Sequence, residues 1–379
     1  MPRASVYLHF PYCLEKCPYC DFVSYKIERA AIDHAAYADA VLRECDTRLD
    51  AGRGRSIASI FIGGGTPSLW EPRELARVLA GVRARFDVTA DVEITVECNP
   101  TSLDRARADA LAEAGVNRLS IGVQSLRDPE LKFLGRLHDA QGAVAAVRAA
   151  LASPIARVSA DLIFGLPGQS PDDAAKQAVT LVDLGLAHLS CYQLTIEPKT
   201  RFGELAKRGR LPLAEDGAVA DAFIAIDDAL TGRGFRHYEI SNYAKPGEEA
   251  RHNLGYWRGE EYLGLGCGAF GFTRTGSRGL RYRNEIDPAR YVHEAPHQER
   301  EELDASALLR ERIMLGLRIE DGFDLAAAGD DLGIDAFTTE RRRAIDTLVT
   351  RKRLTITGTH LCIPRPAWLF ADDTAACLF

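Results

Sequence analysis

The sequence predicts an α/β protein, in which an open, partial (β/α)6 barrel is followed by a smaller C-terminal helical, winged-helix-like domain. Two observations indicate this class. Over the first half of the 379 residues, short apolar and β-branched runs alternate with longer helical patterns, and from residue 305 onward helical patterns return. Alternating strands and helices favour a parallel sheet with right-handed crossovers. Six such units in about 200 residues fit a partial barrel better than a complete eight-fold one.

The elements of the predicted barrel follow one another over residues 1–235. Six runs are expected to be its strands: Val6–Phe10, Ile57–Ile62, Val92–Cys98, Arg118–Val123, Val158–Phe164 and His188–Leu194. Helices are expected between or after them, near 33–50, 71–85, 102–114, 139–152, 171–185 and 215–232. Capping residues such as Ser170 mark the start of several of these helices.

The rest of the chain is expected to form two further parts. Residues 236–304 are rich in Gly, Tyr and charged residues and show few clear periods, which predicts an irregular connecting region. Residues 305–379 show helical patterns over 305–318, 323–332 and 336–351, and then alternate around a glycine between Leu354 and Pro364 like a small hairpin. Helices followed by a hairpin predict the winged-helix-like domain.

Composition excludes several classes of protein. The chain has 46% hydrophobic and 27% charged residues, a globular mix that fits neither a disordered nor a fibrous chain. With 47 basic and 54 acidic residues the formal charge is -7, so no nucleic-acid partner is expected. No secretory signal and no apolar run of about 18 residues is visible, which predicts a cytoplasmic protein. Peripheral contact with a membrane stays open, because net charge says nothing about local patches.

Polar and glycine residues follow the ends of the predicted strands. Gly63–Thr66 come after the second strand, Glu97 ends the third, Gln124 follows the fourth and Asp161 lies in the fifth. In a parallel barrel all strand C-termini meet at one mouth, where active sites are found. In a single loop these residue types would be explained by the needs of an ordinary turn. Their repetition after several strands of the barrel favours a functional site.

Three of the nine cysteines are clustered directly after the first strand, as Cys13-x3-Cys17-x2-Cys20. Clustered thiols in a reducing compartment are more often metal ligands than disulfides. Structural zinc sites usually need four ligands, whereas three thiolates suit a [4Fe–4S] cluster with one iron left open. The alternatives are a zinc site completed by His9 or Asp21, and free thiols.

This spacing resembles the CxxxCxxC motif of the radical S-adenosylmethionine (SAM) enzymes. In that family the open iron is chelated by SAM, and electron transfer cleaves a C–S bond to give a 5′-deoxyadenosyl radical. Tyr19, between the second and third cysteines, also matches the family pattern. Gly63–Thr66 match its glycine-rich loop, where small residues allow close approach of the backbone to the cofactor.

The resemblance narrows to the HemN/HemW branch of that family along nearly the whole chain. The matching segments are YLHFPYCLEKCPYCDF, FIGGGTPS, ITVECNP, RLSIGVQS, LGRLHD, SADLIFGLPGQS, YEISNYAKPG and RHNLGYW. By position, the resemblance implies cluster ligands at Cys13, Cys17 and Cys20, and SAM contacts at Tyr7, Tyr19, Gly64, Gly65, Thr66, Glu97, Gln124, Arg136 and Asp161. For Arg136 and Asp161 the alternative is a structural ion pair at the barrel mouth.

Two features distinguish the members of this branch. The coproporphyrinogen dehydrogenases have another cysteine two places after the third, where this chain has Phe22. CDF and the His252-Asn253-x-x-Tyr256-Trp257 motif are instead typical of the HemW-like heme chaperones. The resemblance therefore implies a chaperone that binds the cluster, SAM and heme, passes heme to a hemoprotein, and meets a flavodoxin- or ferredoxin-type electron donor. Whether the protein is an enzyme stays open, and no catalytic residue is assigned.

Two other functions remain as alternatives. One is a radical SAM oxidase acting on coproporphyrinogen III or a related tetrapyrrole, and the other is a zinc-stabilised interaction protein. His252 is the expected heme ligand because it begins the HNxxYW motif, while the alternative is a histidine hydrogen-bonded in an irregular loop. Gly266–Gly271 match GxGxxG, but no helix pattern follows, so a dinucleotide site is not expected.

Overall fold

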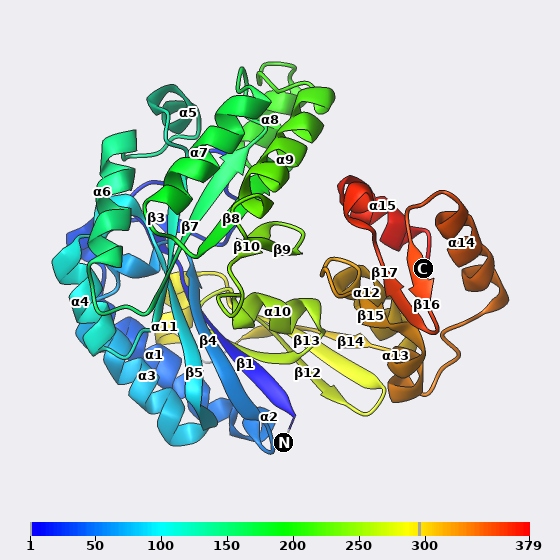
Figure 1. Ribbon diagram of the computed structural model, residues 1–379. Coiled ribbons are helices and arrows are strands. Elements are labelled where there is room, and N and C mark those ends of the chain that lie inside the picture. The colour runs from blue at the N-terminus through cyan, green and yellow to red at the C-terminus, as the bar shows by residue number, and fades with distance from the viewer. Residues whose placement is uncertain (1, 295–296) are drawn as a thin grey trace.

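The computed structural model describes residues 2–294 and 297–379, and its centre is a twelve-stranded sheet (Figure 1). Six parallel strands follow one another in chain order through the sheet and form the partial barrel. They are β1 (Arg3–Phe10), β4 (Ser56–Gly64), β5 (Asp87–Cys98), β6 (Arg118–Gln124), β7 (Arg157–Phe164) and β8 (His188–Gln193). The strands and the parallel order predicted from the sequence are therefore confirmed.

Helices cover the outer face of this sheet (Figure 1). The predicted ones are α1 (His34–Thr47) with α2 (Leu49–Gly52), α3 (Pro72–Arg85), α4 (Arg105–Glu113), α6 (Ala140–Leu151), α7 (Pro171–Asp183) and α9 (Asp216–Thr231). As expected, the side chain of Ser170 caps α7 by accepting a hydrogen bond from the Asp173 amide. Within residues 1–235 two short helices were not predicted, α5 (Asp128–Phe133) and α8 (Arg201–Lys207), since six or seven residues give too few turns for a clear period.

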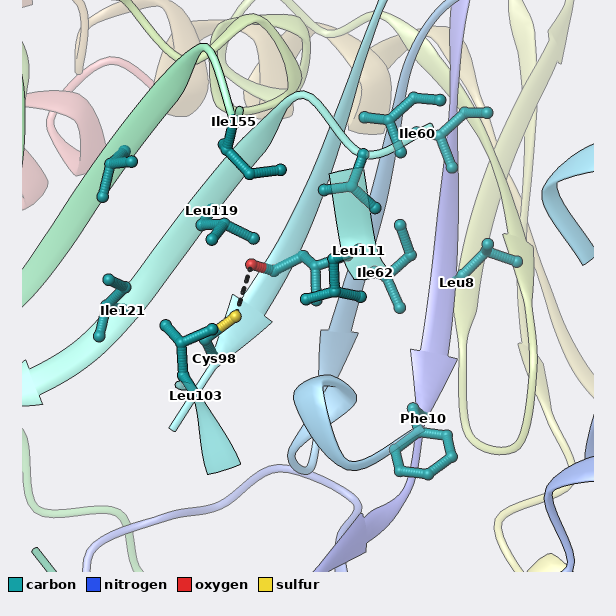
Figure 2. Packing of buried hydrophobic residues seen from close by; sticks show 14 of the residues in the cluster. Leu8, Phe10, Ile60, Ile62, Cys98, Leu103, Leu111, Leu119, Ile121 and Ile155 are labelled. Atoms are coloured by element: carbon teal, nitrogen blue, oxygen red, sulfur yellow. Dashed lines mark hydrogen bonds between the residues drawn. The ribbon is translucent and has the colours of Figure 1, made fainter. Parts of the chain in front are cut away.

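The hydrophobic core lies between the sheet and these helices (Figure 2). Alternate residues along each strand, such as Leu8 of β1, Ile62 of β4 and Ile121 of β6, are buried against helix residues such as Leu111. Because successive side chains of a strand point to opposite faces, the residues between them face the barrel interior. Many of the inward residues are polar, and those near the carboxyl ends of the strands form the site described below.

The expectation of an irregular region over residues 236–304 is wrong. Its described part contains β9 (Arg236–Glu239), β10 (Asn242–Ala244), α10 (Arg251–Trp257), β11 (Glu261–Leu265), β12 (Phe270–Thr275), β13 (Arg278–Asn284), α11 (Pro288–His293) and β14 (Gln298–Leu303). β11 pairs in parallel with β1, and β12, β13 and β14 extend the sheet beyond it. β9 and β10 have only four and three residues, and β13 (RGLRYRN) and β14 (QEREEL) are too rich in charged residues to show an apolar period.

The C-terminal residues form a smaller helical domain with its own hydrophobic cluster. It consists of α12 (Ala305–Gly316), β15 (Phe323–Asp324), α13 (Leu325–Leu332), α14 (Thr339–Thr350), β16 (Thr355–Thr357), β17 (His360–Cys362) and α15 (Ala371–Ala376). The antiparallel pair β16 and β17 confirms the predicted hairpin. Among the described residues no helix combines the length and the apolar character needed to cross a bilayer.

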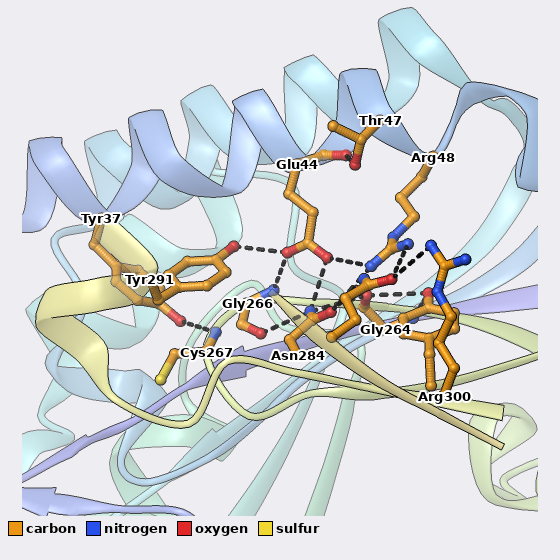
Figure 3. A network of polar contacts seen from close by, with 12 residues as sticks. Tyr37, Glu44, Thr47, Arg48, Gly264, Gly266, Cys267, Asn284, Tyr291 and Arg300 are labelled. Carbon is orange, nitrogen blue, oxygen red and sulfur yellow. Dashed lines mark hydrogen bonds and ion pairs between the residues drawn. The ribbon is translucent and has the colours of Figure 1, made fainter. Parts of the chain in front are cut away.

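A buried polar network ties α1 to the added strands (Figure 3). The carboxylate of Glu44 accepts hydrogen bonds from the Gly266 amide (2.9 Å), the Asn284 side-chain amide (2.7 Å) and the Tyr291 hydroxyl (2.7 Å). The guanidinium of Arg48 completes the set at 2.9 Å. Charge-assisted bonds of this kind are stronger than neutral ones, so Glu44 fixes the turn between β11 and β12 against α1.

Candidate functional site

The three clustered cysteines lie on a loop at the carboxyl end of β1. Two short paired strands, β2 (Tyr12–Cys13) and β3 (Tyr25–Lys26), join the ends of this loop. The Tyr25 amide donates to the Pro11 carbonyl oxygen at 2.7 Å, and the Ile27 amide donates to that of Cys13 at 2.9 Å. The loop is therefore closed at its base, and its thiols are presented at the mouth of the barrel.

A cavity of about 400 Å³ opens at this mouth. Eleven of the predicted site residues line it: Cys13, Cys17, Tyr19, Cys20, Gly64, Gly65, Thr66, Glu97, Gln124, Arg136 and Asp161. Ser120, Tyr192 and Glu197 also line it, and the sequence reasoning did not select them as site residues. The signal that could have found Ser120 is the two-residue period of β6, which puts it on the same face as Gln124.

Hydrogen bonds from neighbouring residues reach two of the thiols. The Thr66 hydroxyl donates to Cys13 Sγ at 3.4 Å, and Arg136 Nη1 donates to Cys17 Sγ at 3.4 Å. Within residues 2–294 and 297–379, no three His, Cys, Asp or Glu side chains converge as ligands of one metal ion would. In a [4Fe–4S] cluster each thiolate binds a different iron, so three spaced thiols around one cavity are a suitable donor set.

His9 is held in a way that does not suit a zinc ligand. Its Nε2 donates to the Val23 carbonyl oxygen at 2.7 Å, so Nδ1 of the neutral ring accepts from the Tyr7 hydroxyl at 2.9 Å. Burial lowers the pKa of His9 to about 4, which keeps the ring neutral. Both ring nitrogens are thus engaged inside the protein, and a zinc site completed by His9 would require these bonds to break.

The glycine-rich loop after β4 packs directly on the cysteine loop. Gly64 has φ +108°, and a Cβ there would lie 2.4 Å from His9 Cε1. A Cβ on Gly65 would lie 2.7 Å from the Tyr12 carbonyl oxygen, and its amide donates to the Phe10 carbonyl oxygen at 2.7 Å. Only glycine fits these two positions, and the resulting backbone surface at the cavity is free of side chains.

Two carboxyl groups face the cavity from neighbouring parts of the barrel. Burial, with the nearby Asp161, raises the pKa of Glu97 to about 8, although the Gly64 amide donates to its Oε2 at 3.1 Å. Burial also raises the pKa of Asp161 to about 6, against hydrogen bonds from Ser190 and Ser120, the latter at 3.1 Å. Buried carboxyls without an ion pair are suited to accept hydroxyl or ammonium donors of a ligand.

Gln124 and Arg136 complete the polar lining on the β6 side. Gln124 has φ 65°, a left-handed conformation that is strained for a residue with a side chain and that is found at functional sites. Arg136 Nη2 donates to the Gly122 carbonyl oxygen at 2.8 Å, while its buried Nε has no partner in the described part of the chain. A ligand carboxylate could satisfy this guanidinium.

Tyr7 and His252 lie outside the cavity lining. Tyr7 is immediately behind it, since a Cβ on Gly63 would be 3.1 Å from both the Tyr7 ring and Glu97 Oε2. His252, on α10, is 1% exposed; its Nδ1 pairs with the Ser59 hydroxyl at 2.9 Å and its Nε2 with the Tyr256 hydroxyl at 3.0 Å. Burial lowers the pKa of His252 to about 3. The structure thus favours the alternative of a packed, hydrogen-bonded histidine over a heme ligand.

The two carboxyls predict a pH dependence of stability in the cofactor-free protein. The folded-state pKa of Glu97 lies above the ordinary value of about 4.3, so unfolding releases a proton between these values. Stability should therefore fall as the pH rises from about 5 to 8, by on the order of 1 kcal/mol per pH unit for each carboxyl, with the contribution of Asp161 ending near its pKa of about 6. Urea unfolding at each pH measures this slope, and Glu97→Gln should flatten it. An unchanged slope in the variant would show that Glu97 is not the titrating group.

Comparison with known proteins agrees with this geometry. The family model of the radical SAM superfamily matches residues 7–177, and that of the HemN C-terminal domain matches residues 303–370. Heme chaperone HemW of Escherichia coli (strain K12) is 44% identical over 272 residues, which cover 72% of this chain and 70% of that protein. Heme chaperone HemW of Mycobacterium tuberculosis (strain H37Rv) is 34% identical over 97% of this chain and 93% of its own length.

A solved structure shows the same fold. It is that of coproporphyrinogen III oxidase (HemN) from Escherichia coli, a radical SAM enzyme, and it matches 100% of this chain and 90% of its own chain with a TM-score of 0.82. At 20% sequence identity this likeness concerns the fold alone. The barrel, the added strands and the C-terminal domain thus occur together in both molecules.

Proposed function

Because the chain belongs to the HemN/HemW branch of the radical SAM superfamily, we propose that it is a heme chaperone. It binds a [4Fe–4S] cluster, SAM and heme, and passes heme to an acceptor hemoprotein. A flavodoxin- or ferredoxin-type protein is the proposed electron donor. The relatives named as heme chaperones, at 34–44% identity, support this proposal over the oxidase alternative.

The cavity fits the first two cofactors. Cys13, Cys17 and Cys20 would hold the cluster, and the open backbone at Gly64 and Gly65 would admit a ligand close to it. When bound, the cluster supplies one-electron reduction of SAM. The chain's own contribution is to bind and orient these groups away from water.

The polar lining offers a partner for each end of a SAM molecule. The unpaired Nε of Arg136 suits the amino-acid carboxylate, while Glu97 and Asp161 suit ribose hydroxyls or the amino group. Among the described residues, Arg136 and Asp161 do not form an ion pair with each other or with any other residue. They are therefore available to a ligand, and the alternative of a structural ion pair at the mouth is not supported.

The observation on which the chaperone proposal rests is the side chain at position 22. Phe22 lines the cavity mouth and is 55% exposed, at the place where the dehydrogenases of this branch have a further cysteine. It offers an apolar ring and no thiol, so a step that needs a thiol there is not available. An exposed aromatic ring suits contact with a flat, apolar macrocycle.

Heme titration of the anaerobically reconstituted protein tests the proposal. We expect stoichiometric heme binding and no protoporphyrinogen formation from coproporphyrinogen III in the presence of SAM and a reductant. His252→Gln, which keeps a hydrogen-bonding side chain on α10, should leave the absorption spectrum of the bound heme unchanged, since His252 is engaged by Ser59 and Tyr256. Sustained oxidative decarboxylation would contradict the chaperone assignment and favour the oxidase.

A further inference from the structure

The heme-binding surface of such a chaperone must lie outside the barrel interior. A cavity of about 400 Å³ is at the lower end of the roughly 300–1,000 Å³ that drug-sized ligands occupy. Its lining is the cysteine loop, the glycine loop and the polar groups that suit SAM. A macrocycle cannot share that space, and His252 is buried and does not line it.

We propose that heme binds on an exposed apolar patch at the rim of the mouth, made of Tyr25, Phe270, Arg283 and Ile286, with its ring system over the apolar side chains and a propionate on Arg283. This rim patch rests on the proposed heme chaperone function, which it makes specific by assigning the docking site.

Contacts in the structure bring these four residues together although they come from three separate segments. The Tyr25 hydroxyl donates to the Ile286 carbonyl oxygen at 2.7 Å, which joins β3 to the segment that follows β13. Phe270 of β12 is the cross-strand neighbour of Arg283 of β13, and the guanidinium lies over the ring, 5.1 Å from its centroid. Arg283 and Ile286 are three residues apart in the chain, and the Gly268 amide donates to the Glu285 carbonyl oxygen at 2.8 Å, so the two pairs lie near each other at the carboxyl end of the sheet.

The rim patch is continuous with the cysteine loop. A Cβ on Gly268, two residues before Phe270, would lie 2.8 Å from the Val23 side chain, so the β11–β12 turn packs on that loop. Val23 is next to Phe22, which lines the cavity mouth. A ligand on the rim patch would thus lie beside the cluster-binding loop rather than behind it.

The side chains of the patch are apolar and open to solvent. Phe270 and Ile286 are each 44% exposed, and Tyr25 is 37% exposed. Phe22, three residues before Tyr25 in the chain, is 55% exposed. Soluble proteins rarely leave large residues exposed together, and such groups mark binding surfaces. Aromatic and aliphatic side chains at this spacing suit a flat, apolar ring system.

Arg283 gives the patch its chemical selectivity. Its neighbour two residues before, Arg281, forms ion pairs with Glu301 at 3.1 Å and Glu311. Within the described part of the chain Arg283 forms no ion pair, and its Nε is buried without a hydrogen-bond partner. Its terminal nitrogens form no hydrogen bond among the described residues, and a guanidinium that rests on an aromatic ring with these donors unused is suited to bind a carboxylate.

Heme titrations of Phe270→Ser and Arg283→Gln in the reconstituted full chain test this site. Each variant should weaken heme binding by at least roughly tenfold while iron content and SAM binding stay at the wild-type level. Arg278→Gln, an exposed arginine at the far end of β13, and Leu213→Ser, an exposed leucine, are the matched controls and should bind heme normally. Heme dimethyl ester separates the two contacts, because loss of the propionate charge should remove the difference between wild type and Arg283→Gln.

The outcomes distinguish the two levels of the proposal. Wild-type affinity in both patch variants would overturn the rim patch and leave the chaperone function standing, since heme would then bind elsewhere. Absence of heme binding by the wild-type protein would overturn both. An equal loss in the patch variants and in the two controls would show a general effect of surface substitution and would also overturn the assignment.

Discussion

Replacement of Cys17 by serine is expected to abolish incorporation of the iron–sulfur cluster. A serine hydroxyl is a poor ligand for iron in such a cluster because it stays protonated at neutral pH, whereas a thiol gives up its proton to the metal. The three cysteines line one cavity, and no fourth cysteine lies on their loop. Cys98 also lines the cavity, but its thiol is buried at the end of β5 and donates to the Val96 carbonyl oxygen, so we do not expect it to replace a lost ligand. Iron and acid-labile sulfide measured after anaerobic reconstitution should fall close to the background of the unreconstituted protein, and the same holds for Cys13→Ser and Cys20→Ser.

The control for this experiment is Cys377→Ser, which removes an exposed thiol far along the chain. It should retain full iron and sulfide, because Cys377 does not line the cavity. If the wild-type protein binds zinc and no iron under these conditions, the assignment of a radical SAM centre fails. If Cys17→Ser keeps its iron, the cluster must be held by other residues.

Of the substitutions proposed for this protein, replacement of Glu44 by alanine is expected to lower the free energy of unfolding the most. It removes the acceptor of four hydrogen bonds and leaves Arg48, 8% exposed, without its ion-pair partner. Breaking a buried pair by removing one partner costs about 3–5 kcal/mol. The midpoint of urea or thermal unfolding should shift accordingly, and part of the loss should return in the double variant Glu44→Ala/Arg48→Ala, in which no buried charge is left unpaired.

The matched control is Asp50→Ala on the neighbouring helix α2. Asp50 forms an ion pair with Arg53 at 2.9 Å, but both side chains are largely exposed, so the unfolding midpoint should not change measurably. An unfolding midpoint of Glu44→Ala equal to that of the wild type would mean that the network of Figure 3 is not needed to hold the β11–β12 turn.

The barrel could be predicted from the sequence because segments with the apolar pattern of strands alternate with segments that have the apolar period of helices. Strands such as β4 and β7 are long enough to show their apolar residues, and helices such as α7 begin with capping residues. The strands between 236 and 304 could not be predicted, since β9 and β10 have only four and three residues. Their formation depends on pairing with strands far away in sequence, which no local pattern reports.

Part of the candidate site could likewise be predicted from the sequence, and part could not. The cysteine spacing and the glycine loop lie within a few residues of each other, so the sequence alone brings them together. The role of His252 could not be decided from the sequence, because a polar, aromatic motif has the same composition whether it binds a ligand or packs inside the protein. The hydrogen bonds from Ser59 and Tyr256 that decide between these are visible only in three dimensions. Ser120 was missed although it lies in the matching segment RLSIGVQS, because a single serine has no distinctive chemistry, and Tyr192 was missed because it lies outside the matching segments.

The position of β1 in the sheet has a consequence for the order of folding. This first strand pairs on one side with β4, which follows it early, and on the other with β11, through partners such as Ala4 and Glu261. Long-range parallel pairing requires closure of a very long loop and is intrinsically slow. During synthesis the cysteine loop is therefore joined to a strand with one unpaired edge until residues 261–265 have emerged from the ribosome. The β11–β12 turn that packs on Val23 can only then close that side of the mouth.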